Sequence, residues 1–205
     1  MRLTDPAGAL VNAGAFIPAA EELGLIRLLD QRALALALDE LRRARDIRLS
    51  LNISTTTLSD TLAVQTYLAA LEDNRSLAQR LTIEITESAA IHDVEQAARF
   101  TRAVRDAGAR VAIDDFGAGY TSFRNLQILA VDLLKIDGIF AQKIAQSREN
   151  QAFVRALCDI ANALGIKTVA EWVDSPDDAA LLRSFGVDYF QGFHFGKPTI
   201  MPPWR

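Results

Sequence analysis

Short apolar runs alternate with longer segments of helical periodicity along most of the chain. Six runs rich in Ile, Leu and Val have the length of buried strands, and they cover residues 48–53, 81–85, 110–113, 133–136, 168–170 and 189–193. In the segments between them, apolar residues recur every three or four positions, as on one face of a helix. The predicted helices cover residues 61–72, 93–106, 151–164 and 176–184, and a helix pair at 15–22 and 25–45 precedes the first strand.

This alternation predicts an α/β fold with a mostly parallel sheet and crossover helices. Six strands fit either an open doubly wound sheet or a (β/α) barrel. No glycine-rich phosphate loop follows the first strand, which disfavours a dinucleotide-binding sheet. We therefore predict a TIM-like barrel. Because a complete barrel has eight strands and typically about 250 residues, we expect this 205-residue chain to lack the first two strands. No linker divides the sequence, so residues 1–205 are predicted to form a single domain.

Polar residues stand where the apolar strands end. In a parallel barrel the carboxyl ends of all strands lie on one rim, which is where active sites form. The adjacent Asp114 and Asp115 would point to opposite faces of a regular strand, unless the backbone bends there. Gly117 and Gly119 follow closely and allow such a bend. The candidate residues on this rim are Asn52, Glu84, Glu87, Asp114, Asp115, Lys135, Asp137, Glu171 and Gln191.

This set of side chains favours a site for hard metal ions. Crowded carboxylates repel one another unless cations neutralise them, and oxygen ligands select Mg²⁺ or Mn²⁺. The two histidines, His92 and His194, are too far apart to suggest zinc. Two such ions suit attack of metal-activated water on a phosphodiester. Lys135 would position that water or stabilise the developing charge, or alternatively form a salt bridge with the acids. Glu171 would be a ligand or a proton acceptor.

Charge and composition exclude several other classes of protein. The net charge of −4 and the pI near 5.2 argue against a general nucleic-acid or anionic-membrane binder. The start of the chain lacks the pattern of a secretory leader, and no apolar stretch approaches the ~20 residues of a membrane helix. The single cysteine, Cys158, cannot form an internal disulfide. These features predict a cytoplasmic protein.

Seven segments closely resemble the EAL family of cyclic-di-GMP phosphodiesterases, and they occur in the family's order. The resemblance implies a modified TIM barrel that opens cyclic di-GMP to linear pGpG with Mg²⁺ or Mn²⁺, and a possible homodimer. It covers the chain from Gly14 to Pro198. The matching segments are GAFIPAAEELGLI, LSLNIS, LTIEITES, VAIDDFGAGYTSF, LLKIDGIF, KTVAEWVD and DYFQGFHFGKP.

The same resemblance implies a role for each rim residue. Lys135 and Gln191 resemble the residues that orient the attacking water and, with Glu171, form the implied catalytic set. Glu87 resembles the acid that anchors the loop after Asp115. Asp137 and Asp174 match positions near the substrate. The implied metal ligands are Asn52, Glu84, Asp114, Asp115 and Glu171.

Besides the two missing strands, which would expose two sheet edges, the sequence departs from the family pattern in two ways. The Glu-Ala-Leu segment and its following arginine are not present before Gly14, which removes one metal-ligand glutamate and one phosphate contact. The family's AEGVE reads AEWVD, so Trp172 replaces glycine and Asp174 replaces glutamate.

These departures leave an alternative open, namely a catalytically impaired cyclic-di-GMP receptor or a protein-interaction module. A different metal-dependent barrel enzyme, such as an aldolase, would account for the acids but not for the order of the motifs.

Overall fold

Six parallel strands form one curled sheet in this protein. The computed structural model describes residues 3–117, 123–200 and 202–204. The strands follow one another in sequence order across the sheet, and every neighbouring pair is parallel. They are β3 (Leu49–Asn52), β4 (Leu81–Thr86), β5 (Arg110–Phe116), β6 (Leu133–Ile136), β7 (Lys167–Ala170) and β8 (Tyr189–Phe190). The predicted α/β fold is thus confirmed as a curled, half-barrel sheet whose carboxyl ends share one rim.

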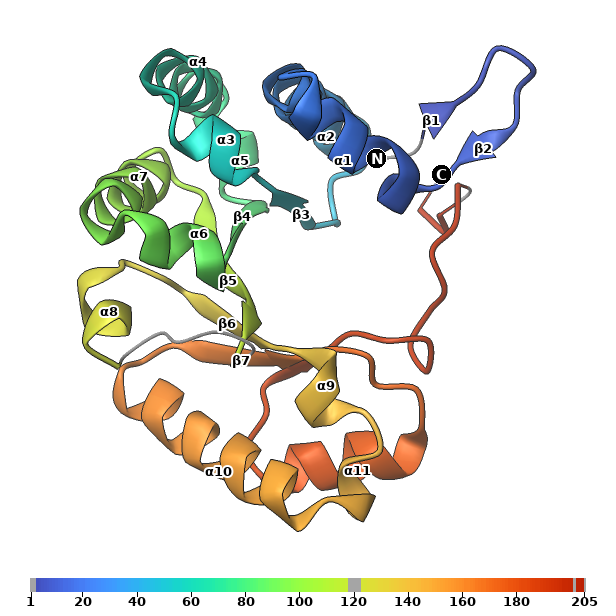
Figure 1. Cartoon of the computed structure of the whole chain (residues 1–205), viewed down its shortest axis with the longest axis vertical. Helices are drawn as coiled ribbons and strands as arrows, with labels where there is room; N and C mark the ends of the chain where they lie inside the picture. The colour runs from blue at the N-terminus through green and yellow to red at the C-terminus, as the bar shows by residue number, and fades with distance from the viewer. Residues whose placement is uncertain (1–2, 118–122, 201, 205) are drawn as a thin grey trace.

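The longer helices cover the outside of this sheet (Figure 1). They are α2 (Ile26–Arg43), α4 (Thr61–Glu72), α7 (Val94–Asp106), α10 (Arg148–Ala163) and α11 (Pro176–Ser184). Side-chain caps fix where several of them begin. Asp93 accepts a hydrogen bond from the Gln96 N–H at the start of α7, and Ser147 accepts one from the Asn150 N–H at the start of α10.

Shorter elements connect these helices to the strands, and the periodicity of the sequence did not predict most of them. They are α1 (Ala13–Glu22), α3 (Thr55–Leu58), α5 (Arg75–Ala78), α6 (Glu87–His92), α8 (Phe123–Ile128), α9 (Gly138–Ala141) and the 3₁₀ helix η1 (Ile144–Gln146). Of this group, only α1 was expected. Elements of one or two turns bury too few side chains to produce a recognisable apolar stripe.

The core lies between the sheet and the helices. Ile83, Ile113 and Leu134, from three of the four inner strands, have no exposed surface. Central strands of a parallel sheet are covered on both faces, which explains their nearly continuous apolar sequences. Two strand boundaries differ from the prediction by more than one residue. β5 runs on to Phe116 and so includes the acidic pair, and β8 ends at Phe190, so that Gln191 follows the strand.

The two ends of the chain lie near each other on the open side of the curled sheet (Figure 1). The N-terminal residues form an antiparallel pair, β1 (Leu3–Thr4) and β2 (Leu10–Val11), which the sequence did not predict. The segment after β8 returns to this region, where the Trp204 indole N–H donates to Glu40 on α2 at 3.0 Å. Among the described helices, none is both long enough and apolar enough to cross a membrane.

A buried carboxylate ties α2 to the turn after β3. Asp30 is 8% exposed, and its Oδ2 accepts hydrogen bonds from the Ser54 N–H (3.0 Å), the Ser54 hydroxyl (2.7 Å) and the Thr57 hydroxyl (2.6 Å). Asp30 lies on the apolar face of α2, four residues after Ile26 and four before Leu34. Because Ser54 follows closely after Asn52, this network fixes the carboxyl end of β3.

We expect Asp30→Ala to lower the free energy of unfolding by about 2–3 kcal/mol, because three donors lose their buried acceptor. The melting temperature should fall by roughly 5–10 °C in a chain of this size. Asp39→Ala on the same helix is the control, since Asp39 only pairs with Arg42 at the surface. Equal melting temperatures for the two variants would contradict this role for Asp30.

Candidate functional site

A single buried ammonium group lies at the centre of the candidate site. The Nζ atom of Lys135 on β6 is 2.8 Å from Glu84 Oε2, 2.7 Å from Asp114 Oδ1 and 2.7 Å from Glu171 Oε1. These three acids come from β4, β5 and the end of β7, and all four side chains are largely buried. Burial alone would lower the pKa of Lys135, but the three carboxylates outweigh it and raise the pKa above its usual value.

An irregularity in β5 brings the adjacent Asp114 and Asp115 to the same site. Ile113 pairs with Leu134 and Phe116 pairs with Ile136, so two residues of β5 oppose Lys135 alone. This is the arrangement of a β-bulge, which redirects side chains. Asp115 has a φ of +55°, and its N–H donates to Asp114 Oδ1 at 3.1 Å. The expected bend thus lies within the acidic pair. Of the glycines expected to allow it, Gly117 comes after it and Gly119 lies outside the described residues.

The bulge completes a cluster of carboxylates. One oxygen from each of Asp114, Asp115 and Glu171 lies within 4.8 Å of the others. Burial raises the pKa of Glu171, with Lys135 acting against it, and burial together with the charge of Asp114 raises the pKa of Asp115. Four carboxylates, counting Glu84, face the one Lys135 ammonium. The cluster therefore carries an excess of negative charge that a cation would neutralise.

Two further predicted residues lie at the border of this cluster. Asn52 is paired in register with Glu84 on the neighbouring strand, and its side chain is exposed. Glu87 is 3% exposed at the start of α6, and its Oε2 accepts a hydrogen bond from the Gly117 N–H at 2.9 Å. Glu87 thus contacts the first residue after β5. The rest of the glycine-containing motif, residues 118–122, lies outside the described part of the chain.

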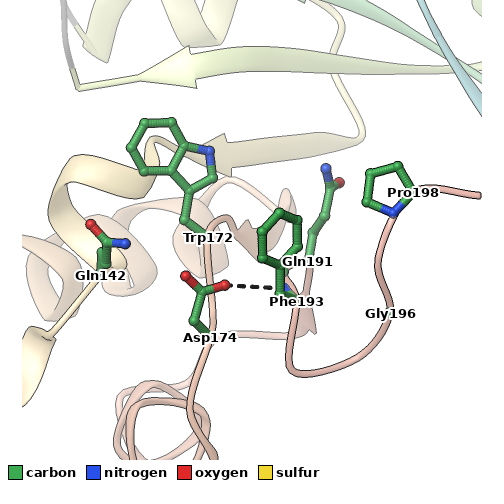
Figure 2. A pocket seen from close by; sticks show the side chains of 8 residues that line it. Gln142, Trp172, Asp174, Gln191, Phe193, Gly196 and Pro198 are labelled. Atoms are coloured by element: carbon green, nitrogen blue, oxygen red, sulfur yellow. Dashed lines mark hydrogen bonds between the residues drawn. The ribbon is translucent and has the colours of Figure 1, made fainter. Parts of the chain in front are cut away.

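Two cavities, each of roughly 390 Å³, share Trp172 as a wall, and Asp115 of the cluster lines one of them. Ligand cavities in proteins start at about 300 Å³. Asp115, Glu87 and Asp137 line one cavity, which also includes Thr86, Ser88 and Ile139. The other is lined by Gln142, Trp172, Asp174, Gln191, Gly192, Phe193, Gly196 and Pro198 (Figure 2). The predicted residues other than Asn52 therefore divide into an ionic cluster around Lys135 and an outer set that faces the cavities, and the exposed Asp115 belongs to both.

Asp137 also has a structural role. Its Oδ1 accepts a hydrogen bond from the Ile139 N–H at 2.9 Å and so caps α9. Asp174 accepts one from the Phe193 N–H at 3.1 Å.

The sequence-based search for site residues missed two features. The first is Asp30, which a polar residue at core spacing on an otherwise apolar helix face could have revealed. The second is the contribution of Phe193 to the cavity wall, for which an aromatic residue directly after the Gln-Gly pair was the available signal.

Comparisons with known proteins all identify similarity to EAL domains and cyclic di-GMP phosphodiesterases. The family model described as EAL domain matches residues 1–198. The cyclic di-GMP phosphodiesterase PdeB of Shewanella oneidensis is 32% identical over 203 residues, which is 97% of this chain and 24% of PdeB. The cyclic di-GMP phosphodiesterase PdeF of Escherichia coli K12 is 30% identical over 202 residues, which is 97% of this chain and 27% of PdeF. The chain thus spans about a quarter of the length of these relatives.

Solved structures agree with these relatives. The complex of PaMucR phosphodiesterase with c-di-GMP superposes with a TM-score of 0.88 at 30% identity, covering 97% of this chain and 82% of that one. The FimX EAL domain from Pseudomonas aeruginosa bound to c-di-GMP gives a TM-score of 0.89 at 27% identity, covering 97% and 81%. Both neighbours hold the same cyclic dinucleotide.

Replacing Lys135 with methionine tests the central ion-pair network. We expect Lys135→Met to lower the free energy of unfolding by about 3–5 kcal/mol, because three buried carboxylates lose their counter-ion. In thermal denaturation this should lower the melting temperature by roughly 10 °C. The deficit should shrink in acidic buffer, because protonation removes the repulsion among the acids.

Lys167→Met is the matched control, since Lys167 pairs with Asp188 and its side chain is 60% exposed. That variant should lose less than about 1 kcal/mol. Equal losses for the two lysines would contradict the central role of Lys135.

Proposed function

The chain belongs to the EAL domain family, and on that premise we propose that its acidic cluster hydrolyses cyclic di-GMP to linear pGpG. The observation that carries the proposal is the β-bulge, because it places the carboxylates of Asp114 and Asp115 beside that of Glu171. Adjacent residues of a regular strand would not share a site. The named function of relatives such as PdeB and the cyclic dinucleotide bound by two structural neighbours support the choice of substrate.

The donor atoms of the cluster fit divalent metal ions. All the clustered ligands are carboxylate oxygens, which Mg²⁺ and Mn²⁺ prefer. We assign Glu84, Asp114, Asp115 and Glu171 as ligands, with the Asn52 amide beside Glu84 as a fifth. Two such ions, when bound, supply activation of water and neutralisation of charge on the phosphate.

The reaction converts one of the two phosphodiesters of the ring into a phosphate monoester and a free 3′ hydroxyl. The oxygen of water forms a new bond to phosphorus, the bond from phosphorus to one ribose 3′ oxygen breaks, and that oxygen leaves as a hydroxyl. We propose that Glu171 accepts a proton from the water. Lys135, held by three carboxylates, would keep the water and the reacting phosphate in line. Gln191 would contact the water from the side of the second cavity.

The remaining assignments concern the borders of the site. Glu87 would anchor the loop after β5 through its hydrogen bond from Gly117. Asp137 and Asp174 line the two cavities and would face the substrate. We also propose that residues 1–205 form a single EAL domain. The cytoplasmic location and the homodimer stay predictions from the sequence.

Thermal denaturation with Mn²⁺ or Mg²⁺ tests the metal assignment. Because the pKa values of Glu171 and Asp115 are raised, ionising these carboxyls lowers the free energy of unfolding. This loss develops as the pH rises through their pKa values. A bound cation removes the loss, so the melting temperature should rise with metal concentration, and more at neutral than at acidic pH. At one hundred times the dissociation constant, the gain is about 2.7 kcal/mol.

Asp115→Asn should abolish most of this metal-induced rise while making the metal-free protein more stable. Asp177→Asn is the control, because Asp177 is exposed in the first turn of α11. A shift of the same size in both variants would contradict the metal assignment.

Hydrolysis is tested by incubating the chain with cyclic di-GMP and Mn²⁺ and separating the products by chromatography. We expect pGpG to form. Asp114→Asn and Glu171→Gln should each reduce its rate at least ~100-fold, since each removes a group that acts directly in the reaction. The control Glu149→Gln, an exposed residue of α10, should leave the rate unchanged.

Two outcomes would count against the proposal. A rate that survives Asp114→Asn would remove the carboxylate cluster from the mechanism. Binding of cyclic di-GMP with no product in Mn²⁺ would identify a receptor instead of a hydrolase.

A further inference from the structure

Trp172 combines a strained backbone conformation with an exposed side chain, and both are unfavourable for a large aromatic residue. Its φ is +51°, a left-handed conformation that bulky side chains rarely adopt. Its side chain is nevertheless 53% exposed, so little burial compensates for the strain. Strained residues persist where a function retains them, and they cluster at ligand sites. Trp172 directly follows Glu171, one of the acids of the cluster.

The indole of Trp172 forms the wall between the two cavities. It packs directly against Gly138 at the start of α9, where a Cβ atom would lie 2.2 Å from both Cγ and Cδ2 of the ring. Asp115 lies on one side of this wall and Gln191 on the other. Each cavity is roughly 390 Å³. The ring therefore separates the acidic cluster from an adjoining space large enough for a small ligand.

The loop that carries Trp172 is held firmly in place. The Val173 N–H donates to the Gln191 carbonyl at 3.0 Å, and the His194 N–H donates to the Val173 carbonyl at 3.2 Å. A Cβ on Gly192 would lie 2.2 Å from the Val173 carbonyl oxygen, so the two backbone segments touch. Figure 2 shows the side chains of Trp172, Gln191 and Phe193 projecting to the same side of these segments. The backbone contacts thus hold the loop in a conformation that leaves the indole exposed.

We propose that Trp172 is a specificity-determining residue whose indole stacks on one guanine base of the dinucleotide. The inference rests on the proposed function, which places a phosphodiester of the same ligand at the acidic cluster. Trp172 directly follows Glu171. When Glu171 is beside the phosphate, the indole would therefore lie beside the base. The carboxylate of Asp174 and the amide of Gln142, in the same cavity, offer hydrogen bonds to the polar edge of guanine.

Tryptophan fluorescence tests the stacking directly. The chain contains two tryptophans, so Trp204→Phe leaves Trp172 as the single reporter. In that background, cyclic di-GMP with Ca²⁺ and GMP alone should both quench the emission, whereas ribose 5-phosphate, which has no base, should not. Quenching by ribose 5-phosphate equal to that by GMP would overturn the proposal.

Binding by variants with intact Trp204 provides the second measurement. By calorimetry, Trp172→Gly should bind GMP roughly 5- to 150-fold more weakly, the range for one stacked base. Trp172→Phe should retain most of the affinity. Trp172→Gly should melt close to the parent temperature, because glycine adopts a positive φ without strain. Unchanged GMP affinity in Trp172→Gly, or a loss that Trp172→Phe does not restore, would overturn the stacking role.

The two proposals fail separately. If the chain releases pGpG but Trp172→Gly leaves both the KM and the affinity for GMP unchanged, the stacking role is wrong and the hydrolase stands. If no pGpG forms while GMP binding still depends on Trp172, the hydrolase is wrong and the base-binding role stands.

Discussion

The site depends on one electrostatic constraint, namely that several carboxylates must be kept together in a space largely closed to water. Glu84, Asp114 and Glu171 come from three different strands, and Lys135 contacts all of them. A buried charge is tolerated only when it is paired. The ammonium group therefore lets these strands end in acids without forcing them apart. One positive charge does not balance four acids, and burial, followed by the charges of neighbouring carboxylates, raises the pKa values of Asp115 and Glu171. The same imbalance would favour the binding of added cations.

The backbone around the cluster shows how this arrangement is maintained. Asp115 adopts a left-handed conformation within a bulge, and Trp172 adopts another directly after Glu171. Both irregularities lie at the carboxyl ends of strands whose inner residues, Val111–Ile113 and Thr168–Ala170, are buried. Strain at the rim is thus supported by regular packing below it. The Asp30 network serves the same purpose at β3, since it fixes the turn that follows Asn52. Packing in the core stabilises the fold enough to offset the strained conformations at the site.

The sequence predicted the main elements and the residues of the rim, but not their exact arrangement. Apolar runs revealed all six strands, because a parallel sheet with helices outside it buries both faces of its central strands. The bulge was not predictable, because it depends on how β5 pairs with β6 and not on β5 alone. The sequence did predict a bend at the acidic pair and attributed it to the glycines that follow, whereas in the structure Asp115 itself adopts the left-handed conformation. The β1–β2 pair was missed because strands of two residues carry no periodic signal.

The ionic cluster and the two outer cavities would contact different parts of one ligand, namely its phosphodiester and its nucleobase. A phosphodiester needs charge neutralisation, which the acids provide only together with cations. A nucleobase needs an apolar face and a few polar contacts, which Trp172 and its neighbours offer outside the cluster. Because Glu171 and Trp172 are consecutive residues on a hydrogen-bonded stretch of backbone, a backbone shift that moves one also moves the other. Recognition of the base and positioning of the phosphate would then be set by the same short stretch of backbone, which explains why strain is tolerated there.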